Sequence, residues 1–237
     1  MKMKHLAFAL ILGFAGLRST AQENKWETVD TYISKDSITK KGFTLIFFNV
    51  DSAFAKSGDE VKARMIDAFF KVYPKEVKAY NKNAMRQVTF VIDPFYEGVA
   101  AASGGVIRFN PQWMLRKPLD LDVVTHEAMH LVQEYGYSAG PVWLTEGIAD
   151  YVRYKFGVAN QESKWSLPDF KATQNYQNSY RITGRFFVWV EKYKYPNLVK
   201  SLDSELRSHT YTDASWKNLT GSTLDELWTS YAANPAI

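Results

Sequence analysis

Residues 123–132 read Val-Val-Thr-His-Glu-Ala-Met-His-Leu-Val, and they contain the pattern His-Glu-x-x-His. On an α-helix, at about 100° per residue, His126 and His130 lie one turn apart on the same side. Two imidazoles in that relation can bind one zinc ion, with Glu127 beside the same metal. The rest of the stretch is apolar enough for a buried helix, where unpaired polar groups would cost several kcal/mol. A metal would compensate for that cost, whereas the alternative is a helix with two solvated histidines and an incidental glutamate.

A second stretch, residues 143–151, reads Trp-Leu-Thr-Glu-Gly-Ile-Ala-Asp-Tyr. A catalytic zinc site needs a third protein ligand and one open position. In the zinc peptidases whose third ligand is a glutamate, that residue comes from the next helix in an E-x-x-x-D pattern, which Glu146 and Asp150 reproduce on one helix face. The resemblance implies that Glu146 binds zinc and that Asp150 accepts the second N–H of a ligating histidine. The reverse assignment stays open, as does an exposed acidic pair.

The first 21 residues have the features of a secretory signal peptide. Lys2 and Lys4 precede an apolar run over residues 6–17, and small residues lead to Ala21, where cleavage is expected. The run is too short to span a bilayer, and no cysteine follows it that could carry a lipid anchor. We therefore expect an exported protein, periplasmic or extracellular, with one domain over residues 22–237 and no membrane anchor.

Charge and cysteine content limit the classes of partner and the sources of stability. The chain has 29 Lys and Arg against 25 Asp and Glu, and loss of the leader with Lys2, Lys4 and Arg18 leaves 26 against 25. A nearly neutral chain gives no support for binding to nucleic acid or to an anionic membrane. Because the sequence has no cysteine, an exported protein of this kind must rely on core packing and metal.

The N-terminal half is predicted to be rich in strands. Residues 43–50 and 86–93 combine aromatic and β-branched residues, as strands do. Between them, apolar residues recur at helical spacing over residues 60–80, with Pro74 expected to kink or split the helix. Asp120 or Asp122 can cap the first metal helix. The second is expected over residues 142–156 and should stop at Gly157.

A short apolar segment, Val-Ile-Arg-Phe at residues 106–109, follows a run of small residues and precedes the metal helix. In zinc peptidases of this general type, the strand before the metal helix forms the upper rim of the cleft and binds the substrate as an added strand. We therefore expect Val106, Ile107, Arg108 and Phe109 to bind the substrate. An ordinary strand within the sheet is the alternative.

The C-terminal third is helical by pattern, and its last helix is expected to start at residues 222–223, where hydroxyls precede acids. A developing oxyanion needs a donor besides zinc, and Tyr180 is the candidate. His209 is the rival, although it stands in a polar stretch typical of the surface. A buried core tyrosine is the other reading of Tyr180.

Four blocks of sequence carry a family resemblance: residues 126–133, 146–153, 180–186 and 224–231. They resemble the plant basic secretory proteins and their bacterial relatives, which are regarded as zinc peptidases. The resemblance covers roughly residues 86–234 and implies a zincin-like fold of the gluzincin type, with zinc chemistry. One departure is charge, since the mature chain is nearly neutral.

These observations predict a secreted, monomeric zinc peptidase of α+β class. A β-rich N-terminal half with an edge strand should meet a helical C-terminal half across a cleft. One Zn²⁺ per chain, held by His126, His130 and Glu146, would activate a water, and Glu127 would act as general base on a peptide or protein substrate.

Two other functions stay open. A secreted binding or defence protein could keep the metal fold without turnover, but a structural zinc site has four protein ligands and would not need Glu127. A zinc hydrolase could instead act on a non-peptide, glycan-linked amide, with Trp143, Tyr151 and Trp165 stacking on sugars. Core packing explains these three aromatic residues equally well.

Overall fold

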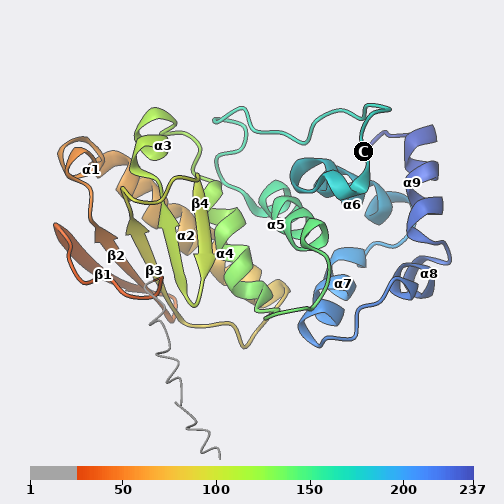
Figure 1. The fold of residues 1–237 in the computed structure, drawn as a ribbon, viewed down its shortest axis with the longest axis horizontal. Helices are drawn as coiled ribbons and strands as arrows, with labels where there is room; N and C mark the ends of the chain where they lie inside the picture. The colour runs from red at the N-terminus through yellow and green to blue at the C-terminus, as the bar shows by residue number, and fades with distance from the viewer. Residues whose placement is uncertain (1–25) are drawn as a thin grey trace, which may run out of the picture.

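The computed structural model describes residues 26–237, so the predicted signal peptide over residues 1–21 lies outside the described part (Figure 1). The strands are β1 (Ser34–Lys40), β2 (Phe43–Asn49), β3 (Gln87–Ile92), β4 (Ala100–Ser103) and β5 (Val106–Phe109). The helices are α1 (Ser52–Ser57), α2 (Asp59–Ala79), α3 (Pro111–Arg116), α4 (Val123–Gln133), α5 (Val142–Phe156), η1 (Tyr176–Asn178), α6 (Tyr180–Tyr193), α7 (Leu198–Arg207), α8 (Ala214–Thr220) and α9 (Leu224–Ala233). Among these residues, no helix is both long and apolar enough to cross a bilayer.

The strands form one mixed sheet in the order β1-β2-β3-β5-β4. The two outer pairs, β1 with β2 and β4 with β5, are antiparallel, and the two inner pairs are parallel. Buried aromatic rings line the face toward the helices, with Phe90 in contact with Phe47, Phe69 and Phe109. The parallel pairs require crossovers, and α2 supplies the long one between β2 and β3.

Pro74 was expected to kink or split this helix, but α2 passes through Pro74 as one continuous helix, so a split is wrong. Proline removes one backbone hydrogen bond, but residues on both sides of it are buried against the sheet and α4. Tyr73 and Val77 are examples, with exposures of 0% and 3%. Packing along the whole length therefore holds the helix together.

The C-terminal half is helical in every element from α5 onward, as predicted. Helix α5 has the predicted bounds and ends at Gly157. The last helix begins with a capping box between Thr223 and Glu226, also as predicted. A second aromatic cluster around Phe186 and Trp216 fills this half.

Helix α4 lies between the sheet and α5 and joins the two halves (Figure 1). All its residues except His130 are buried. The fold is thus a mixed sheet followed by a helical half, with the histidine-bearing helix at their junction. The side of α4 that carries His126 and His130 faces the cleft between β4 and α5.

Candidate metal centre and active site

The start of α4 is held in place by Asp122. This residue occupies the N-cap position, but its carboxylate makes no capping bond to the helix backbone. It accepts hydrogen bonds from Thr125 Oγ1 at 2.9 Å and from the backbone N–H groups of Val158 and Ala159 at 2.7 and 2.6 Å. Asp122 therefore ties α4 to the segment that follows α5, which fixes the two helices relative to each other.

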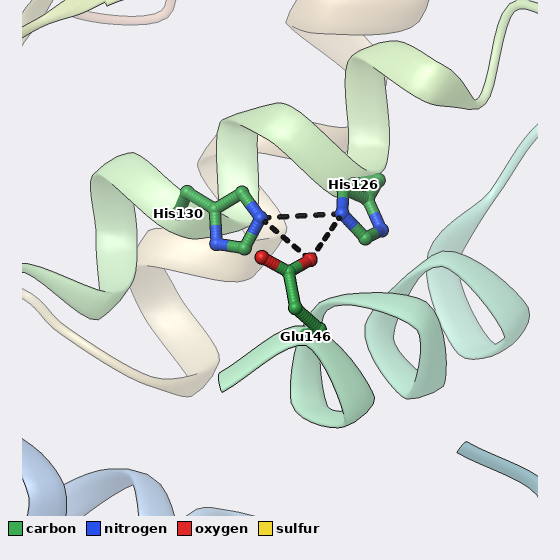
Figure 2. Close-up of side chains that lie close together, drawn as sticks. All are labelled: His126, His130 and Glu146. Atoms are coloured by element: carbon green, nitrogen blue, oxygen red, sulfur yellow. Dashed lines mark hydrogen bonds and ion pairs between the residues drawn. The ribbon is translucent and has the colours of Figure 1, made fainter. Parts of the chain in front are cut away.

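Figure 2 shows His126 and His130 of α4 and Glu146 of α5 pointing toward one another. Glu146 Oε2 lies 3.1 Å from His126 Nε2 and 3.4 Å from His130 Nε2. The two Nε2 atoms are 3.2 Å apart. A tetrahedral zinc ion with bonds of about 2.0–2.1 Å separates its ligand atoms by about 3.3–3.4 Å. The three atoms thus form a nearly equilateral triangle of the size that zinc requires.

Each histidine is oriented through its other ring nitrogen. His126 Nδ1 lies 2.7 Å from Asp150 Oδ1, and His130 Nδ1 lies 2.7 Å from Gln133 Oε1. Gln133 is in turn fixed by donating from Nε2 to the carbonyl of Thr145 at 2.9 Å. With Nδ1 protonated toward these oxygens, both Nε2 atoms are free to face a metal. Gln133 was not predicted from the sequence, although its position three residues after His130 places it on the same helix face.

The charges of this cluster suit a cation. Burial lowers the pKa of His126, but its hydrogen bonds to Asp150 and Glu146 outweigh burial and raise that pKa to about 10. Burial alone would raise the pKa of Glu146, yet hydrogen bonds from both histidines hold it far below its usual range. Without a metal, a proton on His126 therefore compensates the carboxylates.

For Glu127, burial outweighs the attraction of His126 and His130. Its side chain is buried, and its Oε2 atom has no hydrogen-bond partner among the described residues. Burial raises the pKa of this carboxyl. The residue nevertheless lines the same cleft as the two histidines. A buried carboxyl oxygen without a partner, beside a group able to hold a metal, leaves a position for a water or substrate atom.

Tyr180 also lies at this site, whereas His209 does not. Tyr180 is the first residue of α6 and lines the cleft, and its ring stacks near that of His126 with centroids 6.0 Å apart. Its side chain is 53% exposed, so it is not a core tyrosine. Ser179 and Tyr180 both have left-handed backbone angles, with φ of 67° and 49°, a strain often found at functional sites. His209 is exposed beyond the end of α7 and is not among the residues that line the cleft.

A family model described as "Peptidase of plants and bacteria" matches residues 35–231. The chain belongs to this peptidase family. The predicted resemblance to the basic secretory proteins is thereby confirmed. No curated protein sequence shows a significant match to the chain.

Among solved structures, one shares the fold of this family member at low sequence identity, and two others show a weaker similarity. Aminopeptidase A of Legionella pneumophila, in complex with aspartic acid, matches with a TM-score of 0.51 and 16% identity over 83% of this chain. Only 27% of that enzyme is covered, so the chain spans about a quarter of its length. An aminopeptidase N family protein from Idiomarina loihiensis matches with a TM-score of 0.44 and 10% identity, covering 84% of this chain and 46% of the other. An M1 zinc metallopeptidase from Deinococcus radiodurans matches with a TM-score of 0.40 and 12% identity, covering 84% and 48%.

The family member's cleft has a volume of about 1220 Å³, and α4, α5 and the start of α6 line it together with β4. The prediction that residues 106–109 form the edge strand that binds the substrate is wrong. Val106, Ile107, Arg108 and Phe109 form β5, which pairs with β3 on one side and with β4 on the other. A strand paired on both sides has no free backbone groups for a peptide. The edge is β4, Ala100–Ser103, which lines the cleft along its length.

Arg108 has a structural role instead. Its guanidinium pairs with Asp93 at 2.8 Å and donates to the backbone carbonyls of Trp26 and Thr28. These contacts hold the segment before β1 against the sheet. Arg108 is not among the cleft-lining residues.

The three aromatic residues considered for sugar binding have separate locations. Trp143 packs on Tyr176 and Trp216 in the helical half. Tyr151 is buried and donates a hydrogen bond to Glu191. Trp165 lines the cleft, but the guanidinium of Arg153 lies over its ring at 4.4 Å. An aromatic platform made of these three residues is therefore absent.

Proposed function

We propose that this family member is an exported, zinc-dependent peptidase in which His126, His130 and Glu146 bind one Zn²⁺ and Glu127 is the general base. The observation that carries the proposal is the triangle of two Nε2 atoms and one carboxylate oxygen, 3.1–3.4 Å on each side, open to a cleft beside Glu127. Three protein ligands with an open side are typical of catalytic zinc, and four are typical of structural zinc. Export rests on the leader-like pattern of residues 1–21.

Zinc bound there would polarise the scissile carbonyl and lower the pKa of the attacking water. Glu127 accepts the proton of that water and passes it to the leaving amine, so the same carboxyl serves as base and then as acid. Burial favours this role because it raises the pKa of Glu127 and makes the protonated form easier to reach near neutral pH. Asp150 and Gln133 keep the two imidazoles oriented during the reaction.

The peptide would bind to β4 as an added strand, because β4 is the edge of the sheet on the cleft side. Its residues, Ala-Ala-Ala-Ser, have short side chains that leave room for those of the substrate. Tyr180, across the cleft on α6, would donate its hydroxyl to the developing oxyanion.

The test uses the purified mature protein and a casein digest, repeated with an internally quenched peptide. The wild type should cleave, lose activity to a chelator and regain it with zinc. Glu127→Gln should keep about one zinc per chain and lose hydrolysis, while Glu60→Gln, an exposed residue of α2, should behave as wild type. Full activity in Glu127→Gln, or activity that resists the chelator, would overturn the mechanism. Loss of zinc from Glu127→Gln would show that this residue is a ligand.

A further inference from the structure

The part of the cleft near the start of α4 contains a charge pair that satisfies itself. Arg153 Nη2 lies 2.5 Å from Asp120 Oδ1, and the Arg153 guanidinium also covers the ring of Trp165. The second carboxylate oxygen of Asp120 accepts from Trp113 Nε1 at 3.0 Å. All four side chains line the cleft. Asp120 and Arg153 therefore neutralise each other and leave this region without net charge of their own.

Arg181 lines the same cleft and is exposed, but it has no acidic partner within the described residues. Among residues 26–237, no carboxylate lies within 4.0 Å of its guanidinium, and its one hydrogen bond goes to the carbonyl of Ser166 at 3.3 Å. Arg181 follows directly after Tyr180, whose ring stacks near His126. A cation without an acidic partner among the described residues therefore lies in the same cleft as the proposed reaction centre.

The location of Arg181 is unfavourable for the free protein. It is the second residue of α6, where the helix dipole disfavours a cation, and the first turn of α6 has no acidic residue. Arg185, one turn later, is by contrast paired with Asp169 at 3.5 Å and donates to the carbonyl of Pro235. A ligand carboxylate would relieve the unfavourable interaction of Arg181 with the helix dipole, since it would pair with the guanidinium near the positive end of the helix.

We propose that Arg181 binds a carboxylate of the substrate and thereby makes the enzyme prefer acidic peptides. This inference rests on the proposed peptidase function and adds a substrate class to it. The carboxylate can belong to an acidic side chain or to the C-terminus of the peptide, and both would pair with a planar guanidinium. A charge-assisted contact of this kind should change kcat/KM about tenfold, which corresponds to about 1.4 kcal/mol.

The experiment uses the zinc-loaded mature protein and one parent peptide that it cleaves. Glutamate or glutamine is placed at each position in turn, and every peptide is made as a free acid and as a C-terminal amide. We expect the wild type to prefer glutamate about tenfold at one position, or the free acid over the amide, which identifies the source of the carboxylate. Arg181→Gln should abolish that preference, and Arg181→Lys should keep part of it. Arg86→Gln is the matched control, because Arg86 is also exposed, has a single 3.3 Å hydrogen bond to a backbone carbonyl and lies outside the cleft.

The outcomes separate this proposal from the peptidase function. If Arg181→Gln cleaves peptides and retains the wild-type preference, or if the wild type has no preference for a carboxylate, Arg181 is not a specificity residue and the peptidase function stands. If the wild type cleaves no peptide, the peptidase function fails. In that case, fluorescence anisotropy with labelled versions of the same peptides measures their affinities for the wild type and for Arg181→Gln. If the ratio of the affinity for the acidic peptide to that for the neutral peptide is equal in the two proteins, the role proposed for Arg181 is overturned.

Discussion

Zinc binding should release a proton from His126. In the metal-free protein, hydrogen bonds to Asp150 and Glu146 overcome the effect of burial and raise the pKa of this imidazole to about 10. Zinc needs the lone pair of Nε2, so the proton there must leave, while the proton on Nδ1 stays with Asp150. Since pH 7.5 is about 2.5 units below that pKa, the apparent zinc affinity at pH 7.5 should be about 300-fold below its limit at high pH. That factor corresponds to roughly 3 kcal/mol.

Titration calorimetry in two buffers of different ionisation enthalpy measures the number of protons released. We expect about one per zinc at pH 7.5 from His126, and more than one if Glu127, whose pKa is also raised, loses a proton as well. Competition with a chelator should show the affinity rising about tenfold per pH unit between pH 6.5 and 8.5. Asp150→Asn removes the largest cause that raises the pKa of His126, so this variant should release fewer protons and show a flatter pH dependence.

Asp67→Asn is the control, because Asp67 is an exposed acid on α2 that pairs with Lys71. It should release as many protons as the wild type. Zinc binding without proton release at pH 7.5 would refute the reasoning. An unchanged pH dependence in Asp150→Asn would refute the part assigned to the hydrogen bond between Asp150 and His126.

Three further predictions follow from individual side chains. Glu146→Ala should nearly empty the zinc site, whereas Asp150→Ala should weaken zinc binding about 10–100-fold in a chelator competition; a weaker effect at Glu146 would reverse the two roles. Tyr180→Phe should lower kcat by about 10²–10³ with little change in KM, and normal turnover by this variant would exclude Tyr180 as the oxyanion donor. Glu76 is fully buried with both carboxyl oxygens unpartnered in the described part of the chain, and burial raises its pKa well above the usual value. Because the Glu76 carboxyl loses its proton at lower pH in the unfolded chain than in the folded protein, the contribution of Glu76 to stability falls as pH rises above about 4.5. Glu76→Leu should therefore stabilise the fold by about 1–3 kcal/mol, and thermal melts should show a larger gain at pH 8 than at pH 5. Equal gains at both pH values would contradict this explanation.

Much of the candidate site could be predicted because its residues come from local patterns. His126 and His130 share a helix face by their spacing, and Glu146 and Asp150 share another for the same reason. The structure brings these four side chains together, with Asp150 on His126 as the E-x-x-x-D pattern implied. Gln133 could have been added by the same spacing argument, since it follows His130 by three residues.

The edge strand could not be predicted in the same way. The segment 106–109 is rich in apolar and β-branched residues, which favours a strand, whereas Ala100–Ser103 has little β propensity of its own. The latter is a strand because it pairs with β5, and no local pattern shows which of two neighbouring strands lies outermost. The expectation that Arg108 binds the substrate was wrong because its partners Trp26 and Thr28 are some 80 residues away in the chain, where no local pattern could indicate them.

The sequence by itself determined the elements that depend on nearby residues: the histidine helix, the bounds of α5, the capped start of α9 and the family. Helical spacing and end signals act within a few residues, so they can be read along the chain. Only the tertiary structure decided the order of strands in the sheet, the separation of Tyr180 from His209 and the distance of Arg181 from every carboxylate of residues 26–237. Each of these depends on contacts between segments far apart in sequence, whose free energy comes from packing the whole core and not from any local pattern.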